Sequence, residues 1–316
     1  MSLNERAHEL CDEMAADAQT LGVAVRTLAC GTRLIDCGVE AAGSVEAGRR
    51  LAEVCLAGLG TVYVKPAVSG TPTAQQVHVT ANAPVAACMA SQYAGWRIGV
   101  DDYFAIGSGP MRAAAGKEEL FQHIGHTEKP EAAVGVLETS QPPTPAVCRY
   151  IAEACGVPAD RLTLLFARTA SLAGHVQVAA RSAETALHKL HELGFDLATV
   201  QSAWGTAPLP PVAKNDLQGI GRTNDAVLYG GAVTLWVRGD DAAIAEIGAK
   251  IPSSASRDFG EPFESIFARY DHDFYKIDPL LFSPAAVTFH NLATGRTHRF
   301  GELRPDVLRR SFLGTD

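Results

Sequence analysis

Hydrophobic and polar positions along residues 1 to 140 switch between a helical and a strand periodicity. Apolar side chains at helical spacing predict helices at 2–21, with Asn4 as the N-cap, and at 44–59. Alternating apolar and polar positions predict strands between and after these helices. The expected strands cover 23–28, 33–37, 61–64, 77–80 and 103–106. Interleaved helices and strands of this kind indicate mixed α/β layers.

The same mixture continues in the second half of the chain. We predict strands at 162–167, 176–180 and 226–237, and a helix that starts close to Arg181. The segment 205–225 contains several Gly and Pro residues, which predicts a loop. The second half is therefore also expected to be mixed α/β.

Residues 138–145, ETSQPPTP, separate the two halves. Two adjacent prolines and a third nearby fit neither the interior of a helix nor a central strand. The length of 316 residues also exceeds the size at which one core usually stops growing, about 250 to 300 residues. We predict an α+β fold of mixed α/β layers, with two domains side by side at 1–140 and 146–316. This boundary is approximate, and segments can cross it.

Charge and composition narrow the class of partner. A formal net charge of -8, with no cluster of Lys and Arg, argues against nucleic acid and against an anionic membrane surface. Residues 1–23 carry charges throughout and lack the apolar core of a signal peptide, and no run of about 18 apolar residues follows. We expect a cytoplasmic protein that binds a small molecule.

Cysteines and histidines give no sign of a metal centre. The seven cysteines form no CxxC motif, as expected of reduced thiols that mostly pack in the core. His123 and His126 lie three residues apart, as do His188 and His191, but neither pair has a further ligand at suitable spacing. We therefore expect neither a metal site nor a disulfide framework.

The stretch AIGSGPMRAAAG at 105–116 joins an apolar run to a predicted helix. Gly107 and Gly109 flank Ser108, and exposed amides at such a turn attract anions. Arg112 stands where a dinucleotide fingerprint needs its third glycine, so this is not such a motif. A plain strand-to-helix turn and a cradle for a polar ligand both fit the pattern.

Two later segments also carry candidate binding groups. GIGRTND at 219–225 places Arg222 and Asn224 in the predicted loop, where binding residues often concentrate. Lys276 lies among aromatic and acidic residues at 269–287, a mixture that suits a flat heterocycle. A simple turn and an aromatic core with a charged rim explain these segments as well.

Arg181 and Glu184 are three residues apart at the start of a predicted helix. Positions with this spacing share one helix face, so the guanidinium and the carboxylate can touch. An exposed ion pair of this kind contributes only about 0.3 to 0.5 kcal/mol and is common. The spacing alone therefore leaves open whether the pair is a solvated ion pair or part of an active site.

Several long runs together resemble the methenyltetrahydromethanopterin cyclohydrolases, in order and over nearly the whole chain. These runs are SGTPTAQQVHVTANAPVAACMASQYAGW (69–96), AIGSGPMRA, HVQVAARSAETALHKLHELGFD, GRTNDAVLYGGAVTLWV, SSASRDFGEPFESIF and DFYKIDPLLFSPA. The resemblance implies hydrolysis of 5,10-methenyltetrahydromethanopterin to its N5-formyl form in one-carbon metabolism, with neither metal nor redox cofactor. It also implies two α/β domains with a large pocket between them, and a homotrimer. The family's suspected catalytic arginine and glutamate fall on Arg181 and Glu184.

The chemistry of the methenyl bridge fits this assignment. The bridge carbon lies between two nitrogens of an amidinium-like cation, so it is already electrophilic and needs a positioned water. Glu184 would accept a proton from that water while Arg181 orients the carboxylate or holds the developing oxygen. The residues expected to contact the substrate are Gly107, Ser108, Gly109, Arg112, Arg222, Asn224 and Lys276. We expect the 105–116 turn and the Arg181 helix to open onto one pocket.

Two alternatives stay open at this stage. The first is a cyclohydrolase that acts on a folate-type or another bicyclic amidine with the same Arg/Glu pair. The second is a protein that binds a pterin without catalysing its hydrolysis.

Overall fold

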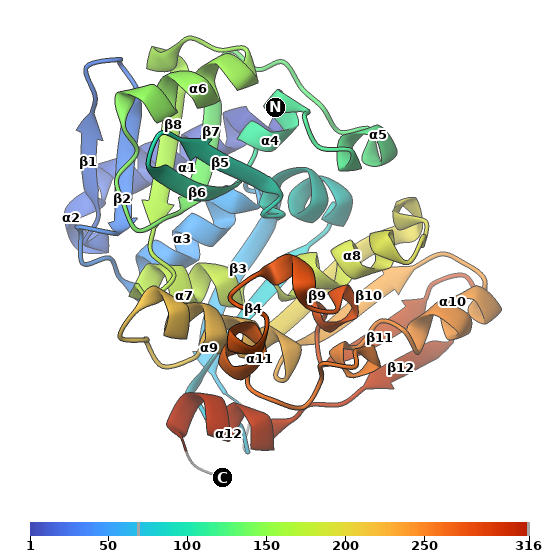
Figure 1. Cartoon of the computed structure of the whole chain (residues 1–316). Helices are drawn as coiled ribbons and strands as arrows, with labels where there is room; N and C mark the ends of the chain where they lie inside the picture. The colour runs from blue at the N-terminus through green and yellow to red at the C-terminus, as the bar shows by residue number, and fades with distance from the viewer. Residues whose placement is uncertain (68–69, 315–316) are drawn as a thin grey trace. The chain divides into compact units, whose positions relative to one another are not determined.

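The computed structural model describes residues 1–67 and 70–314. Contacts within the chain divide it into two compact units. The first unit comprises Met1–Thr61 and Ala86–Gln177, and the second comprises Val62–Val85 and Val178–Asp316. Each unit is built around one six-stranded sheet (Figure 1). The predicted mixed α/β fold class is thereby confirmed.

The sheet of the first unit has the order β1-β2-β8-β7-β6-β5. Its central strands β2, β8 and β7 run parallel, and the remaining neighbours pair antiparallel. The buried, uninterrupted apolar sequence LTLLFA of β8 is typical of a strand covered on both faces. The strands are β1 (Ala24–Thr27), β2 (Arg33–Gly38), β5 (Trp96–Val100), β6 (Tyr103–Ser108), β7 (Ala133–Glu138) and β8 (Leu162–Ala167).

Helices cover both faces of this sheet (Figure 1). Leu34 and Leu164 pack on the α6 side, whereas Ile35 and Leu165 pack on the side of α1 and α3, as the alternation of strand side chains requires. The helices of this unit are α1 (Leu3–Ala16), α2 (Ala18–Leu21), α3 (Val45–Cys55), the π-helix η1 (Val85–Gln92), α4 (Met111–Ala115), α5 (Leu120–Ile124), α6 (Pro145–Cys155), the 3-10 turn η2 (Ala159–Arg161) and α7 (Leu172–Ala179), whose last residues belong to the second unit.

The sheet of the second unit has the order β12-β11-β10-β9-β4-β3. β10 and β11 run parallel. β9 pairs antiparallel with both β4 and β10, and β12 pairs antiparallel with β11. Every second residue of β10 and β11 is buried, so one face of these strands is more open than the other. The strands are β3 (Gly60–Pro66), β4 (Gln75–Ala81), β9 (Val200–Pro208), β10 (Ala232–Val237), β11 (Ala286–Asn291) and β12 (Thr297–Gly301).

Three helices of the second unit, α9, α11 and α12, form an aromatic-rich cluster of their own. Tyr229 and Phe263 are its largest fully buried members. Together with the short 3-10 turns, the helices are α8 (Ser182–Glu192), η3 (Leu197–Thr199), α9 (Asp216–Leu228), α10 (Asp241–Gly248), η4 (Ser253–Ala255), α11 (Phe263–Arg269), η5 (Phe274–Lys276), η6 (Pro279–Leu281) and α12 (Pro305–Leu313). Within residues 1–67 and 70–314, no helix has the length and apolar character needed to cross a bilayer.

Four local predictions are wrong. The expected strand 176–180 lies mostly in helix α7, because Ala173, Val176 and Ala180 are buried at helical spacing. The expected loop 205–225 contains the end of strand β9 and most of helix α9, and the strand expected at 226–237 starts only at Ala232. Asn4 is not the N-cap of α1.

Ser2 caps α1 through a capping box with Glu5. The side chain of Asn4 is buried and bonded instead: its amide donates to the carbonyl of Pro110 at 3.0 Å, and its oxygen accepts from the amide of Val134 at 2.8 Å. These two hydrogen bonds of Asn4 therefore connect α1 to Pro110, just before α4, and to β7.

The proline-rich segment connects two neighbouring elements. β7 ends at Glu138, and Thr144 caps α6, whose first residue is Pro145. Both elements belong to the first unit. In the structure, the prolines therefore serve a connection inside that unit, where Pro145 occupies the first helical turn without losing a hydrogen bond.

Candidate active site

Arg181 and Glu184 lie together where α7 gives way to α8. Arg181 is the residue before α8, and Glu184 lies in its first turn. A guanidinium nitrogen of Arg181 lies 3.7 Å from a carboxylate oxygen of Glu184. The exposed fractions are only 7% for Arg181 and 5% for Glu184, so the pair is not a solvated surface ion pair.

Backbone hydrogen bonds fix the start of α8. The amide of Arg181 donates to the carbonyl of Val178 at 3.0 Å, and the Arg181 carbonyl accepts from the Thr185 amide at 2.8 Å. The Thr185 hydroxyl donates to the same carbonyl at 2.9 Å. A carboxylate in the first turn is also favoured by the partial positive charge of the helix N-terminus. The position of Glu184 is therefore set by local structure as well as by Arg181.

Gly205 of β9 lies directly against the first turn of α8. A Cβ atom at this position would clash with the Ser182 hydroxyl and would lie 2.9 Å from the amide nitrogen of Ala183. Real Cβ atoms essentially never come this close to another heavy atom. Glycine is therefore required for α8 to approach the sheet at the turn that carries Glu184.

Lys189 anchors the far end of α8. Its side chain is 2% exposed, and its amino group donates to the carbonyl of Leu280 in η6 at 2.8 Å. Burial lowers the pKa of Lys189 to about 8, against the opposing attraction of Asp278 and Glu192. Both ends of α8 are thus held within the second unit.

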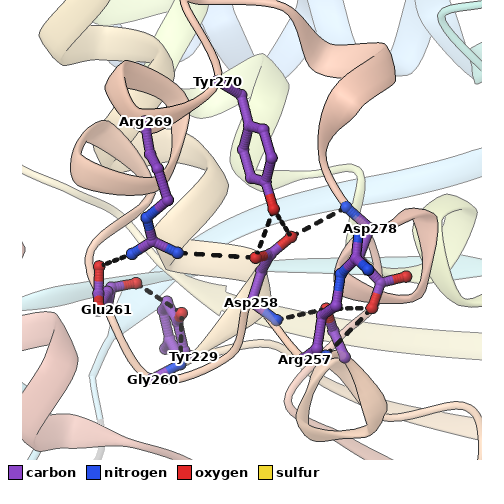
Figure 2. A network of polar contacts seen from close by, with 9 residues as sticks. Tyr229, Arg257, Asp258, Gly260, Glu261, Arg269, Tyr270 and Asp278 are labelled. Atoms are coloured by element: carbon purple, nitrogen blue, oxygen red, sulfur yellow. Dashed lines mark hydrogen bonds and ion pairs between the residues drawn. The ribbon is translucent and has the colours of Figure 1, made fainter.

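Asp278 belongs to a polar network around Asp258 (Figure 2). The buried Asp258 carboxylate accepts from the Tyr270 hydroxyl at 2.9 Å and from the Asp278 amide at 3.0 Å. The Asp278 carboxylate accepts from the hydroxyl of Ser256 and from the amide of Arg257. These bonds connect the segment after η4 to α11 and to the turn that Lys189 contacts.

The 105–116 turn joins β6 to α4, as predicted. Ser108 is 2% exposed, and the Gly109 amide donates to the Ser91 carbonyl at 2.9 Å. Gly107 is a sheet residue, and a Cβ there would lie 2.8 Å from atoms of Ile98 and Met111. Tight packing therefore accounts for glycine at this position.

The Arg112 guanidinium has protein partners on several sides. It donates to Glu118 at 2.8 and 2.5 Å and to the carbonyls of Met89 and Ser91 at 2.9 and 3.3 Å. It also lies over the ring of Tyr93, 5.0 Å from the ring centre. These bonds support a structural role, and contact of Arg112 with a substrate stays a prediction.

Arg222 and Asn224 lie on helix α9 and not in a loop. Arg222 donates to the carbonyls of Pro211 and Val212 at 3.1 and 3.3 Å, and Asn224 donates to the Ile220 carbonyl one turn earlier. Arg222 therefore braces the segment that leads into α9. Its role as a substrate contact, like that of Asn224, stays a prediction.

Lys276 lies in η5 with an exposed side chain that pairs with Asp271 at 3.3 Å. Lys276 belongs to the second unit together with Arg181 and Glu184, whereas the 105–116 turn belongs to the first. A common site for the two sets stays a prediction. In the part of the chain that the structure describes, no group of three or more His, Cys, Asp or Glu side chains could hold a metal ion.

Three residues that support the site escaped the sequence analysis. Lys189 follows Glu184 by five positions and looks like a surface lysine in the local pattern. Gly205 lies in a segment predicted to be a loop. The Asp258 carboxylate accepts from Tyr270 and from the Asp278 amide, which lie 12 and 20 positions later in the sequence. A helical wheel of α8 that placed Lys189 on its buried face would have been the one available signal for Lys189.

Comparison with known proteins shows the family of the chain. The sequence profile of the family described as Cyclohydrolase (MCH) matches residues 2–312. The chain is 47% identical to a methenyltetrahydromethanopterin cyclohydrolase of Methylobacterium sp. (strain 4-46), over 98% of this chain and 97% of that protein. It is 48% identical to the Rhodopirellula baltica enzyme of the same name, over 89% and 86% of the two chains. The Methanosarcina barkeri enzyme is 42% identical over 99% and 98%. The chain belongs to the cyclohydrolase (MCH) family.

Proposed function

We propose that this protein hydrolyses 5,10-methenyltetrahydromethanopterin to N5-formyltetrahydromethanopterin. The observation that carries the proposal is the full-length match to methenyltetrahydromethanopterin cyclohydrolases. The burial of the Arg181–Glu184 pair supports it. The substrate's methenyl carbon forms part of a cationic amidine, so water can add to it once correctly placed.

Glu184 is the proposed general base. As water attacks the methenyl carbon, Glu184 accepts its proton and a tetrahedral adduct forms. The bond from this carbon to N10 then breaks as N10 takes up the proton held by Glu184. The adduct hydroxyl loses its proton to solvent, and the carbon remains on N5 as a formyl group. Arg181 keeps the carboxylate oriented and supplies positive charge beside the developing oxygen. Burial of both side chains strengthens these interactions relative to water.

Further parts of the proposal concern substrate contacts and assembly. We assign contact with the substrate to Gly107, Ser108, Gly109, Arg112, Arg222, Asn224 and Lys276, and we assign a homotrimer to the assembled enzyme. Lys276 has the most accessible side chain of the charged residues in this set. Lys276→Ala is therefore the first variant in which to look for a raised KM. Analytical ultracentrifugation tests the trimer.

The decisive experiment follows the loss of the methenyl chromophore with purified protein. Methenyltetrahydromethanopterin and methenyltetrahydrofolate are compared side by side, each with and without EDTA. We expect faster turnover of the methanopterin substrate and no effect of EDTA. A preference for the folate compound would reassign the substrate. Binding without acceleration over the uncatalysed rate would make the protein a pterin carrier, and loss of activity in EDTA that metal restores would overturn the metal-free mechanism.

A further inference from the structure

Strands β7 and β8 of the first unit send the chain to opposite faces of their sheet. The two strands are parallel neighbours, and Glu138 pairs with Ala167 at their carboxyl ends. After β7 the chain continues into α6, which packs with Leu164 on one face. After β8 it continues into α7, whose Ala173 belongs to the cluster of Leu165 on the other face. In open α/β sheets, ligands bind outside the carboxyl ends of the strands at such a switch point.

Glu138 supplies a carboxylate at this end of β7. It is the last residue of the strand, and its side chain is partly exposed. Thr169, which is buried in the connection from β8 to α7, donates a hydrogen bond from its hydroxyl to one oxygen of this carboxylate. An ionised carboxylate offers about four lone-pair positions, and this bond uses one of them. Thr169 therefore orients the Glu138 carboxylate and leaves it able to accept hydrogen bonds from a ligand.

Phe104 of β6 lies on the same face of the sheet as Glu138. Ile106 is directly opposite Glu138 in the antiparallel pair of β6 and β7, so Phe104 is a diagonal neighbour about 7 to 8 Å away. Phe104 is 54% exposed, and its partner in β5 is Gly99, where a Cβ would meet no atom within 4 Å. The Thr139 hydroxyl donates to the Phe104 carbonyl at 2.9 Å. An exposed ring with open space beside it is therefore fixed next to the carboxylate.

The apolar cluster on this face stops short of Phe104. Among the residues that the structure describes, its buried strand members come from β2, β7 and β8. Val136 belongs to the cluster, whereas Glu138, two positions later on the same face, is partly exposed. A flat ligand stacked on Phe104 would therefore remove from water an apolar surface that this cluster leaves uncovered.

We propose that Glu138 and Phe104 bind the pterin ring of the substrate, an inference that rests on the proposed function. The pyrimidine edge of a pterin presents two adjacent N–H donors, one on N3 and one on the 2-amino group. A carboxylate is complementary to this edge, because its two oxygens accept both hydrogen bonds at once. The flat ring stacks on the phenyl ring of Phe104. Glu138 is thus a residue that determines specificity for the ring.

The test compares 6-methylpterin with 6-methyllumazine, which carry an amino group and an oxygen at C2, respectively. Their binding to the purified full chain is measured by calorimetry, independently of turnover. The wild type should bind the pterin about 10- to 100-fold more tightly, since the C2 oxygen of the lumazine would face a carboxylate and lose a charge-assisted hydrogen bond. In Glu138→Gln, the amide can accept from N3–H and donate to the C2 oxygen. This variant should therefore lose or reverse the preference.

Three further variants complete the test. Phe104→Leu should weaken both rings alike, because stacking does not depend on the group at C2. Thr169→Val removes the hydroxyl that orients the carboxylate and should reduce the preference severalfold. Glu131→Gln replaces an exposed glutamate just before the other end of β7 and should bind both rings as the wild type does. With methenyltetrahydromethanopterin, Glu138→Gln should raise KM by about 10-fold or more at a similar kcat.

Two results would overturn the proposal. The first is a wild type that binds the two rings equally well or does not bind them. The second is a wild-type preference that persists in folded Glu138→Gln, or in Thr169→Val if Glu138→Gln fails to fold. Folate carriers contain the same ring, so faster turnover of the folate compound, or binding without turnover, would change the proposed function and leave this inference standing. Normal turnover of the methanopterin substrate without ring selectivity would contradict this inference alone.

Discussion

The amino group of Lys189 donates a hydrogen bond to the backbone carbonyl of Leu280 at 2.8 Å, inside the second unit. The bond connects the last turn of the helix that carries Glu184 to a short turn almost a hundred residues later. Since this lysine is buried, its ionisation and the stability of the unit are coupled.

We predict that Lys189 gives the protein a stability that rises with pH in the alkaline range. Its pKa is about 8 in the folded protein and 10.5 ordinarily, so the folded state binds fewer protons between these values. The free energy of unfolding should therefore rise as the pH goes from about 8 to about 10.5. Urea unfolding of Lys189→Met should lack this rise, whereas the exposed control Lys250→Met should keep it. An unchanged slope in Lys189→Met would contradict the assignment.

Glu184→Gln should lower kcat by about 100-fold or more with little change in KM, because the amide keeps the shape of the side chain but cannot act as a base. Arg181→Lys should also be impaired, since an ammonium group cannot reproduce the planar fork of a guanidinium. Glu192→Gln, on the same helix with an exposed side chain, serves as the matched control and should turn over normally. Normal turnover of Glu184→Gln would return the pair to a structural role.

Gly205→Ala should destabilise the second unit by about 1 to 3 kcal/mol, because the new methyl group meets the first turn of α8. The displaced turn also carries Glu184, so kcat should fall as well. A Cβ at Gly239, in the same unit, would meet no atom within 4 Å, and Gly239→Ala is therefore the control. Thermal unfolding and turnover, measured on both variants, test this prediction. Equal melting temperatures would show that α8 can shift without cost.

Asp225 should make the protein less stable as the pH rises from about 4 to about 7. Its carboxyl group is fully buried and accepts from the Phe263 amide at 2.8 Å. Burial raises its pKa from 3.8 to about 7, so the folded state retains a proton that the unfolded chain releases. This stabilisation is complete below pH 4 and is lost as the pH passes 7, by up to about 4 kcal/mol.

Urea unfolding of Asp225→Asn across this pH range measures the effect. The variant should show a flatter dependence than the wild type, while Asp102→Asn at an exposed position should not differ from it. Parallel curves for Asp225→Asn and the wild type would mean that Asp225 ionises normally.

Arg112→Lys separates a structural role from substrate contact. The bidentate bond to Glu118 and the bonds to two carbonyls need the guanidinium, so the variant should melt at a lower temperature. If Arg112 also contacts the substrate, as proposed above, KM should rise as well. The control Arg97→Lys replaces an exposed arginine of β5. A lower melting temperature at an unchanged KM would remove Arg112 from the proposed substrate contacts and leave it a structural role alone.

Local sequence patterns correctly predicted those helices and strands that their own residues are sufficient to specify. Helix α3 begins after Ser44, a residue that can cap it, and β8 is an uninterrupted apolar run, so both were found. The three-residue spacing of Arg181 and Glu184 likewise indicated that the two side chains could touch, and they lie 3.7 Å apart.

The misassigned elements depend on partners distant in the sequence. Gly219 and Gly221 weaken α9 as an isolated helix by about 1 kcal/mol each, which is why the segment resembled a loop. In the fold, a Cβ at Gly221 would lie 3.0 Å from the Cβ of Glu264, so the glycine lets α9 approach α11. The partners of Lys189 and Asp258 are likewise set by tertiary contacts that no local window contains.

The order in which the second unit acquires its strands has a consequence for synthesis on the ribosome. β4 pairs with β9, so that Gln76 lies opposite Pro208. Among the strands that the structure describes in this sheet, only β3 precedes β4. The residues between them include most of the first unit. During translation, β3 and β4 therefore leave the ribosome before their partner β9 and stay without it while the rest of the first unit is synthesised. The nascent chain exposes an incomplete sheet edge for this interval, and a fragment that stops at residue 177 would expose it permanently.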